Sequence, residues 1–572
     1  MTQLGAHLHL AYLGHSGLKS GTGGDRLSLA PNLARAPVAF DAELKQPVRF
    51  REAISALHDI VVCDQRFQKR DRTAYEAYRR GEQERTSAIA RDARHAALDA
   101  AKAESGITPE FDKSFRAGVR RYWRLRDQYS RILQREDPAL FRMLTPCDPI
   151  VTVADDVCLF EGFSKDESAY GCLSVRRDDG FGASPNLQLG TTNVDYSWRL
   201  FDEFQSLRTY NTTRFLVDPE GFTVATTDRP DYREEKIDLP DGWLRGLMQI
   251  QTAMGLPSTR VELTREAVYS LLAHLRRHRR EHSPRALRFE LVEGEAPVLV
   301  LEPWEVRIPV HGVVHTGPSI EPIRIWGRRR LQVLARTLPL ADRVTVHLLG
   351  TGLPSFWLVH MGEMTLTLGL SGWTTNDWTT SSALDLLRPP VDATPDALEI
   401  TAGLLQQRQT MTLLELLKAT RLPKAELATT LDYLAHAGQV MHDLAAGVYR
   451  WRSIMPAAVG EAQIGGRNPE LLAAQELAIS GATRIARDEA LPRNARLLAG
   501  KAGNNPCELV LDGDARIKRG KCDCGHHRRS GIRKGPCRHL IALRMVGTAT
   551  SGQLPKSGNQ MWERVVNRLF GE

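Results

Sequence analysis

The stretch that decides the fold of the C-terminal part runs from residue 507 to residue 545 and has the sequence CELVLDGDARIKRGKCDCGHHRRSGIRKGPCRHLIALRM. Within it, a Cys-x-Cys pair is followed, after a gap of twelve residues, by a Cys-x-His pair. The four residues are Cys522, Cys524, Cys537 and His539. Three thiolates and one imidazole are the donors of closed structural zinc sites, in which protein fills all four positions. We therefore expect zinc as a structural cofactor, and no catalytic residue at this site.

Local signals place these ligands on defined elements. Residues 507–517 indicate two short strands joined by an Asp-Gly turn, so the first ligand pair follows a hairpin. The apolar residues after His539 indicate a short amphipathic helix that starts near it. His526 and His527 are alternative imidazole donors. Because they follow Cys524 by only two and three residues, we expect them to be solvated loop residues instead.

The strand pair, Cys-x-Cys, basic loop, Cys-x-His and helix together resemble the SWIM-type zinc finger over residues 506–548. Such fingers occur in transposases, helicase-related proteins and ubiquitin-pathway proteins, and the family is regarded as binding DNA or proteins. The chain lacks helicase loops and a RING cysteine array. Its layout is also similar to bacterial SWIM proteins that accompany MoxR-type ATPases and von Willebrand A-domain proteins, through the stretch GTGLPSFW at 350–357. That resemblance implies those two protein classes as partners.

Positive charge is concentrated on the same stretch. The whole chain has a formal charge of +8, whereas residues 515–545 hold ten Lys or Arg against Asp523, which gives +9 and leaves −1 for the rest. A local basic surface of this kind suits phosphates or an acidic protein surface, although simple solvation also explains it. The candidate nucleic-acid contacts in the finger loop are Arg528, Arg529, Arg533 and Lys534.

Residues 395–452 have the pattern of a winged helix. Leucines at helical spacing indicate three helices, with Pro423 at the start of the third and Gly438 after its end, and two short strands follow. If this unit binds DNA, the third helix enters the major groove and the second strand lies near phosphate. The residues in these positions are Lys424, Thr429, Tyr433 and His436 on the helix, and Arg450 and Arg452 on the strand. Because that helix face carries little charge, protein docking is an equal alternative.

The length of 572 residues is too great for one hydrophobic core. Strand-like alternation after residue 146 is interrupted by helices near 197–208, 264–281 and 328–337, which indicates an α+β class. We predict an α+β multidomain protein. Its parts are a largely helical N-terminal region (1–145), a central α+β domain (146–390), a winged-helix-like domain (395–455), a helical linker (456–505), the SWIM-type zinc finger (506–548) and a C-terminal tail (549–572).

Two classes of function fit these features. The first is a non-enzymatic, cytoplasmic adaptor or nucleic-acid-binding protein, since neither a secretory signal nor a membrane-spanning run is evident. The second is an enzyme with a site in the α+β region, which the C-terminal modules deliver to a target. The adjacent acids Asp155-Asp156 and Asp202-Glu203 are candidates for a transposase-like metal site. Phosphate-loop and dinucleotide-binding motifs are lacking, and we favour the first class.

Overall fold

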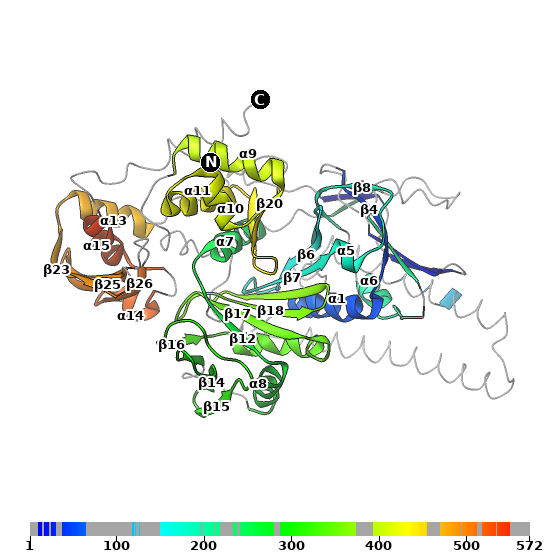
Figure 1. Ribbon diagram of the computed structural model, residues 1–572, viewed down its shortest axis with the longest axis horizontal. Helices are drawn as coiled ribbons and strands as arrows, with labels where there is room; N and C mark the ends of the chain where they lie inside the picture. The colour runs from blue at the N-terminus through cyan, green and yellow to red at the C-terminus, as the bar shows by residue number, and fades with distance from the viewer. Residues whose placement is uncertain are drawn as a thin grey trace. The chain divides into compact units, whose positions relative to one another are not determined.

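The computed structural model (Figure 1) describes residues 10–13, 17–21, 24–29, 37–63, 149–217, 233–236, 241–278, 286–372, 393–454, 469–492, 495–511, 517–532 and 535–548, except 195, 197 and 211, with isolated positions between 117 and 125. The chain divides into two compact units, one made of Met1–Asp64 with Cys147–Glu572 and the other of Gln65–Pro146. The second unit lies almost wholly outside the described residues, as does the expected tail (549–572). The described part mixes helices with several sheets, which confirms the α+β class.

An eight-stranded antiparallel sheet forms the centre of the first unit. In spatial order its strands are β12 (Thr259–Leu263), β17 (Arg343–Leu348), β18 (Ser355–Met361), β19 (Met364–Leu370), β7 (Ala169–Arg176), β6 (Val157–Phe163), β5 (Ile150–Val153) and β9 (Gly190–Asn193). Its middle strands are buried on both faces, which explains their continuous apolar sequences. The uncharged run 344–362 contains most of β17, a tight turn and all of β18.

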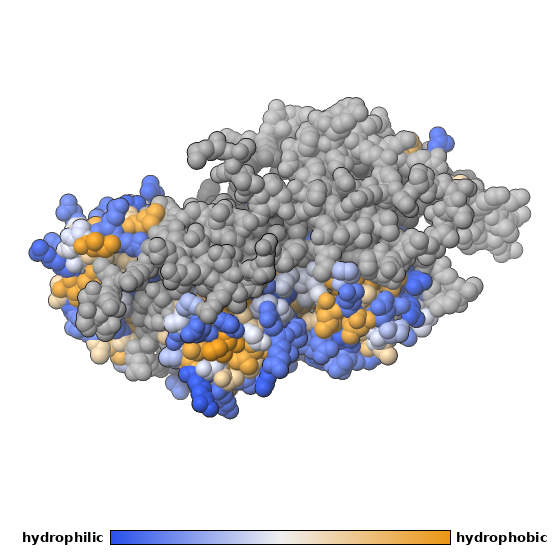
Figure 2. Space-filling model, turned by 90° about the horizontal axis from the view of Figure 1, so that it is seen from above, coloured by the Kyte–Doolittle hydropathy of each residue, from blue (hydrophilic) through white to orange (hydrophobic). Residues whose placement is uncertain are grey.

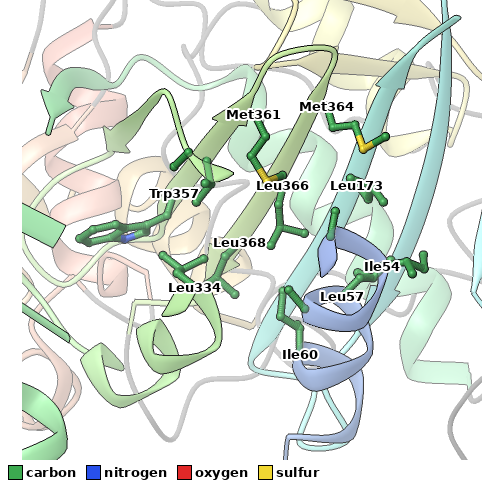
Figure 3. Packing of buried hydrophobic residues seen from close by; sticks show 14 of the residues in the cluster. Ile54, Leu57, Ile60, Leu173, Leu334, Trp357, Met361, Met364, Leu366 and Leu368 are labelled. Atoms are coloured by element: carbon green, nitrogen blue, oxygen red, sulfur yellow. The ribbon is translucent and has the colours of Figure 1, made fainter. Parts of the chain in front are cut away.

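Helices cover both faces of this sheet. On one face lie α1 (Pro47–Val62), α8 (Arg265–Arg277) and the 3₁₀ helix η1 (Arg328–Arg336), and on the other lies α7 (Asp241–Gly255). Figure 3 shows Ile54, Leu57 and Ile60 of α1 in the same buried cluster as Leu173, Leu366 and Leu368 of the sheet. Helix α1 approaches β7 so closely that a Cβ at Gly171 would lie 2.5 Å from Leu57 Cδ1. Figure 2 shows apolar patches surrounded by hydrophilic residues on the visible described surface.

The helices expected in the central region are present, with α6 (Trp198–Phe204), α8 and η1 at the predicted positions. Short elements complete this region: α5 (Arg177–Gly180) and η2 (Leu338–Leu340). A further four-stranded antiparallel sheet has the order β15 (Val306–Pro309), β14 (Val298–Leu301), β13 (Leu287–Leu291) and β16 (Ile320–Ile325).

The expectation of a largely helical N-terminal region is wrong for the described residues before α1. They form strands β2 (Gly17–Gly21), β3 (Gly24–Leu29) and β4 (Ala39–Leu44), which join β10 (Thr213–Val217) and β8 (Leu187–Gln188) in a five-stranded sheet, and β1 (Leu10–Leu13), which pairs with β11 (Arg233–Lys236). β2 pairs with β3, whereas β1, β3 and β4 have partners from residues 187–236. Because such pairing is long-range in sequence, local periodicity does not reveal it.

Residues 393–454 contain three helices and a small sheet. The helices are α9 (Pro395–Arg408), α10 (Leu413–Thr420) and α11 (Lys424–His436), and the sheet has the order β20 (Thr410–Met411), β22 (Val448–Trp451) and β21 (Val440–Asp443). Thr412 and Glu415 form a capping box at the start of α10. Gly438 has a φ of 71° just after α11, as its sequence position predicted. The predicted helices and strands of this stretch are therefore confirmed.

Residues 469–548 form a four-stranded antiparallel sheet, with strands in chain order, and three helices. The elements are α13 (Pro469–Ile479), β23 (Thr483–Leu491), β24 (Ala495–Ala502), β25 (Asn505–Leu511), β26 (Ile517–Cys522), α14 (Gly525–Ser530) and α15 (Arg538–Thr548). The predicted hairpin is β25–β26, and the predicted helix near His539 is α15. The helical linker expected at 456–505 is wrong for Thr483–Leu491 and Ala495–Ala502, which form β23 and β24. Charged side chains along the outward face obscure the strand alternation there.

Candidate metal centre and basic surface

The four predicted ligands converge although they come from three different elements. Cys522 ends β26, Cys524 is the N-cap of α14, Cys537 directly precedes α15, and His539 lies in the first turn of α15. Their donor atoms all lie within 4.8 Å of one another. Donors about 2.3 Å from a tetrahedral metal are separated by about 3.8 Å, so a small contraction would complete the coordination sphere. The cluster can therefore hold a metal ion.

The hydrogen bonds of the cluster favour ionised sulfur. The Sγ atom of Cys522 lies 3.7 Å from His539 Nδ1. The Cys537 thiol donates to Cys522, which lowers the pKa of Cys522 to about 5, and the same bond raises the pKa of Cys537. The backbone N–H of His527 donates to Cys524 Sγ at 3.3 Å. Because thiolates are the form of cysteine that binds metal, this arrangement prepares Cys522 as a ligand, whereas Cys537 must give up its proton when a metal binds.

The structure distinguishes between the three candidate histidines. Only His539 belongs to the cluster. His526 Nε2 lies 3.3 Å from the Gly535 carbonyl oxygen, on the loop that leads to Cys537. His526 and His527 are half-buried on α14, so the expectation that they are solvated loop residues is wrong. The sequence spacing did not indicate this helix.

The cluster of four donor residues lies at the edge of a small apolar core. Leu509, Leu540 and Leu543 are fully buried in it, together with the sulfur ligands Cys522 and Cys537. Strand β26 passes so close to α15 that a Cβ at Gly520 would lie 2.7 Å from Leu540 Cδ1. A core of this size provides little stability by itself. A metal that ties β26, α14 and α15 together would therefore contribute much of the folding free energy of this module.

The basic residues of the stretch 515–545 are not equivalent. Arg528 and Arg529 are exposed on α14, whereas Arg533 and Lys534 lie outside the described residues. Three further cations of the stretch are paired with carboxylates or buried. Arg519 pairs with Glu321 at 2.6 Å, Arg538 pairs with Glu470 at 2.7 Å, and Arg544 is buried. The charge of +9 counted from the sequence thus overstates the charge available to a partner.

The sequence analysis missed a second group of cations, on the face of the sheet opposite α15. Arg484 of β23 and Lys501 of β24 are directly opposite each other in the strand register, and both are exposed. Among the described residues, neither forms an ion pair with a carboxylate. Arg519 and Lys521 of β26 alternate with the buried Cys522 and therefore share this outward face. Recognising β23 and β24 as strands would have revealed the group.

The residues predicted to read DNA on the third helix have different environments. Lys424 is exposed at the start of α11, and Tyr433 is half-buried against the core of residues 393–454. Thr429 is buried, and His436 is buried with its Nδ1 2.7 Å from Thr252 Oγ1 of α7. Because α7 covers this part of α11, His436 is not available to a base edge. The placement of Thr429 and His436 on an open face is therefore wrong.

The two arginines expected near phosphate are also buried. Arg450 pairs with Asp443 at 3.0 Å and with Asp156 of the central sheet. Arg452 pairs with the buried Glu161 of β6, which also accepts a hydrogen bond from Tyr170. Desolvation opposes the charge of each arginine, but the partner carboxylates more than compensate and raise the pKa of Arg450 and Arg452. These cations hold residues 393–454 on the sheet and do not face solvent.

The acidic pairs expected for an enzyme site, Asp155-Asp156 and Asp202-Glu203, do not form a cluster of metal donors. Within the described ranges, Cys522, Cys524, Cys537 and His539 are the only group of three or more clustered His, Cys, Asp or Glu donors. Asp156 is instead the ion-pair partner of Arg450. No helix that the structure describes has the length and apolar character needed to cross a bilayer.

Comparisons with known proteins find weak structural similarity. No protein-family model matches the sequence, and no curated protein matches it. Part of the chain is weakly similar to sliding clamps. One is the proliferating cell nuclear antigen of Entamoeba histolytica, with a TM-score of 0.27, 10% identity, and coverage of 39% of this chain and 89% of the clamp. Another is the A. fulgidus PCNA bound to the C-terminal region of FEN-1, with a TM-score of 0.26, 15% identity, and coverage of 39% and 88%.

Proposed function

We propose that this protein is a non-enzymatic, zinc-binding protein whose C-terminal module, residues 469–548, binds the phosphate backbone of nucleic acid. Zinc is the metal that fits three thiolates and one imidazole in tetrahedral geometry, whereas hard cations prefer oxygen donors. The order of β25–β26, Cys-x-Cys, α14, Cys-x-His and α15 supports the resemblance to a SWIM-type finger.

The metal in this proposal has a structural role. Four protein donors lie within 4.8 Å of one another, so a bound zinc ion has no open position for water or substrate. Removing it would loosen the module and the surfaces that the module presents. Zinc therefore supports binding indirectly, by holding β26 and the two following helices in place.

The observation that carries the binding proposal is the pair Arg484 and Lys501. Directly opposite residues in antiparallel strands have Cβ atoms about 5 Å apart, and like charges in these positions repel each other. Both side chains are exposed and lack a carboxylate partner among the described residues. A bound phosphate would relieve the repulsion, because one anion can accept hydrogen bonds from both cations.

The remainder of this outward face indicates how the ligand is recognised. Lys521 adds positive charge to this face, although Glu508 lies opposite it. Arg519 and Arg487 lie on the same face but are already paired, with Glu321 and Glu489. The outward-facing residues of the four strands include no aromatic side chain. Without a ring on which bases can stack, we expect phosphate contacts that position the nucleic acid without reading its sequence. The exposed Arg528 and Arg529 of α14 would extend these contacts.

We assign a different role to residues 393–454. Their three helices and small sheet support a winged-helix interpretation, but His436, Arg450 and Arg452 contact α7 and the central sheet. These contacts favour protein docking within the chain over base recognition. The MoxR-type and von Willebrand A-domain partners implied by the sequence resemblance remain predictions.

The proposal is tested by charge reversal on the full-length chain. We expect Arg484→Glu/Lys501→Glu to weaken binding to a labelled oligonucleotide and to reduce the salt dependence by about 0.7 in slope per lost single-strand phosphate contact. The matched control is Arg276→Glu/Arg277→Glu, which makes the same charge change at two exposed positions on α8. Equal loss in both variants would mean that only net charge matters, and unchanged binding in the sheet variant would contradict the proposal.

A further inference from the structure

The imidazole of His539 is held from both sides by groups with different roles. Its Nδ1 atom faces the other donor residues, 3.7 Å from Cys522 Sγ. Its Nε2 atom lies 3.1 Å from Nδ2 of Asn505, the first residue of β25. Asn505 is half-buried and is not itself a member of the donor cluster. It is therefore in contact with a metal ligand but not with the metal position.

We propose that Asn505 is the positioning residue that makes His539 a ligand through Nδ1, an inference that rests on the proposed zinc site. A histidine that binds metal through Nδ1 uses the lone pair of that atom, so its ring proton must reside on Nε2. An Nε2–H needs an acceptor, and the side-chain oxygen of Asn505 supplies it when the amide rotates by half a turn. The oxygen and nitrogen of an amide are nearly isosteric, so this rotation requires no other movement.

The backbone around Asn505 explains why its side chain can serve this purpose. Ala502 and Asn505 pair across the tight turn between β24 and β25, in which Gly503 has a φ of 57°. Two residues further along β25, and so on the same face of the strand, Cys507 Sγ lies 3.9 Å from the carbonyl oxygen of His539. Cys507 also pairs in register with the ligand Cys522. Strand β25 thus fixes both the ring and the backbone of His539 relative to the cluster.

The expected energetic effect follows from other metal sites in proteins. Hydrogen bonds to the second nitrogen of a histidine ligand fix its tautomer and orientation, and their loss weakens metal binding by about 10-fold to 100-fold. Leucine has nearly the shape of asparagine but accepts no hydrogen bond. Aspartate accepts the Nε2–H bond more strongly than an amide does, because it carries a full negative charge.

The test compares the zinc affinities of three variants in the full-length chain, measured by competition with a chromophoric chelator. We expect Asn505→Leu to bind zinc about 10-fold to 100-fold more weakly than the wild type, and Asn505→Asp to bind it at least as tightly. The matched control, Asn504→Leu, changes the exposed neighbouring residue in the turn and should leave the affinity unchanged. In the ¹⁵N spectrum of the zinc-bound wild type and of Asn505→Asp, the Nε2 atom of His539 should carry the proton.

Three outcomes would overturn the inference. The first is an Asn505→Leu affinity equal to that of Asn504→Leu. The second is equal weakening by Asn505→Leu and Asn505→Asp, which would indicate a merely structural role, and the third is a spectrum with the proton on Nδ1. Failure of the zinc proposal itself is distinguished by Cys524→Ser, because a variant that keeps its zinc without this thiolate would contradict the site and not only the role of Asn505.

Discussion

Arg452, which directly follows β22, forms a buried ion pair with Glu161 of β6, and both side chains are 1% exposed. The two residues are separated by 291 positions in the chain. Glu161 also accepts a hydrogen bond from Tyr170, so one carboxylate joins the small sheet of residues 393–454 to two strands of the central sheet. The buried ion pair therefore holds residues 393–454 against the central eight-stranded sheet.

We predict that loss of the Arg452–Glu161 ion pair lowers the free energy of unfolding. Arg452→Met should lower the free energy of unfolding by about 3–5 kcal/mol, because Glu161 would remain buried without its counter-ion. Arg452→Met/Glu161→Gln should recover part of the loss, since the neutral amide still accepts from Tyr170. Denaturation of the full chain measures these values. Arg265→Met, which removes one member of an exposed pair with Glu266, should have an effect of no more than about 0.5 kcal/mol. An equally small effect of Arg452→Met would contradict the buried pairing.

We predict that the metal site and the fold of the C-terminal module depend on each other. Cys524→Ser should lose zinc and hydrogen-exchange protection in β23–β26, while the strands of the central sheet keep theirs, because structural zinc supplies the stability of a small module. Cys63→Ser is the matched control, since Cys63 is a half-buried cysteine on another part of the chain and is not one of the four donors. Zinc content and hydrogen exchange are measured on both variants. Full zinc content in Cys524→Ser, or zinc loss in Cys63→Ser, would contradict the ligand assignment.

We predict that the central sheet and the helices packed on it lose stability as the pH falls from about 6.5 to about 4. Burial, together with Lys165 and Arg336, lowers the pKa of His58 to about 4. The unfolded chain keeps a histidine pKa near 6.5, so it binds more protons than the folded state in this interval, and unfolding becomes easier as the pH falls. His58→Gln should reduce the slope by at most about 1.4 kcal/mol per pH unit.

The control for this pH dependence is His311→Gln, at an exposed position. It should leave the slope unchanged. His58 contacts Tyr196 Oη at 3.0 Å and stacks on Phe201, so His58→Gln will also lower stability at neutral pH. The relevant quantity is therefore the change of stability with pH. A slope that is the same in wild type and His58→Gln would show that the pKa of His58 is the same in the folded and unfolded chain, which contradicts the prediction.

The features that the sequence predicted are those with a local cause. The ligand spacing around Cys522 indicated the metal cluster, because short loops and helix starts bring close residues together. Leucine periodicity and Pro423 indicated α9–α11 for the same reason. Burial could not be predicted in this way. Arg450 and Arg452 have the sequence of an exposed strand, and only their distant partners Asp156 and Glu161 make them interior residues.

The central claim is tested most directly by titrating the zinc-loaded, full-length protein with labelled single-stranded and duplex oligonucleotides at several salt concentrations. Fluorescence anisotropy should reveal binding at low salt, with similar affinity for different base sequences. The logarithm of the binding constant should fall linearly with the logarithm of salt concentration, by about 0.7 per phosphate contact on single strands and about 0.9 on duplexes. If the protein binds neither form even at low salt, where counterion release favours association most, nucleic-acid binding is contradicted and an acidic protein surface becomes the partner for the cations around Arg484 and Lys501.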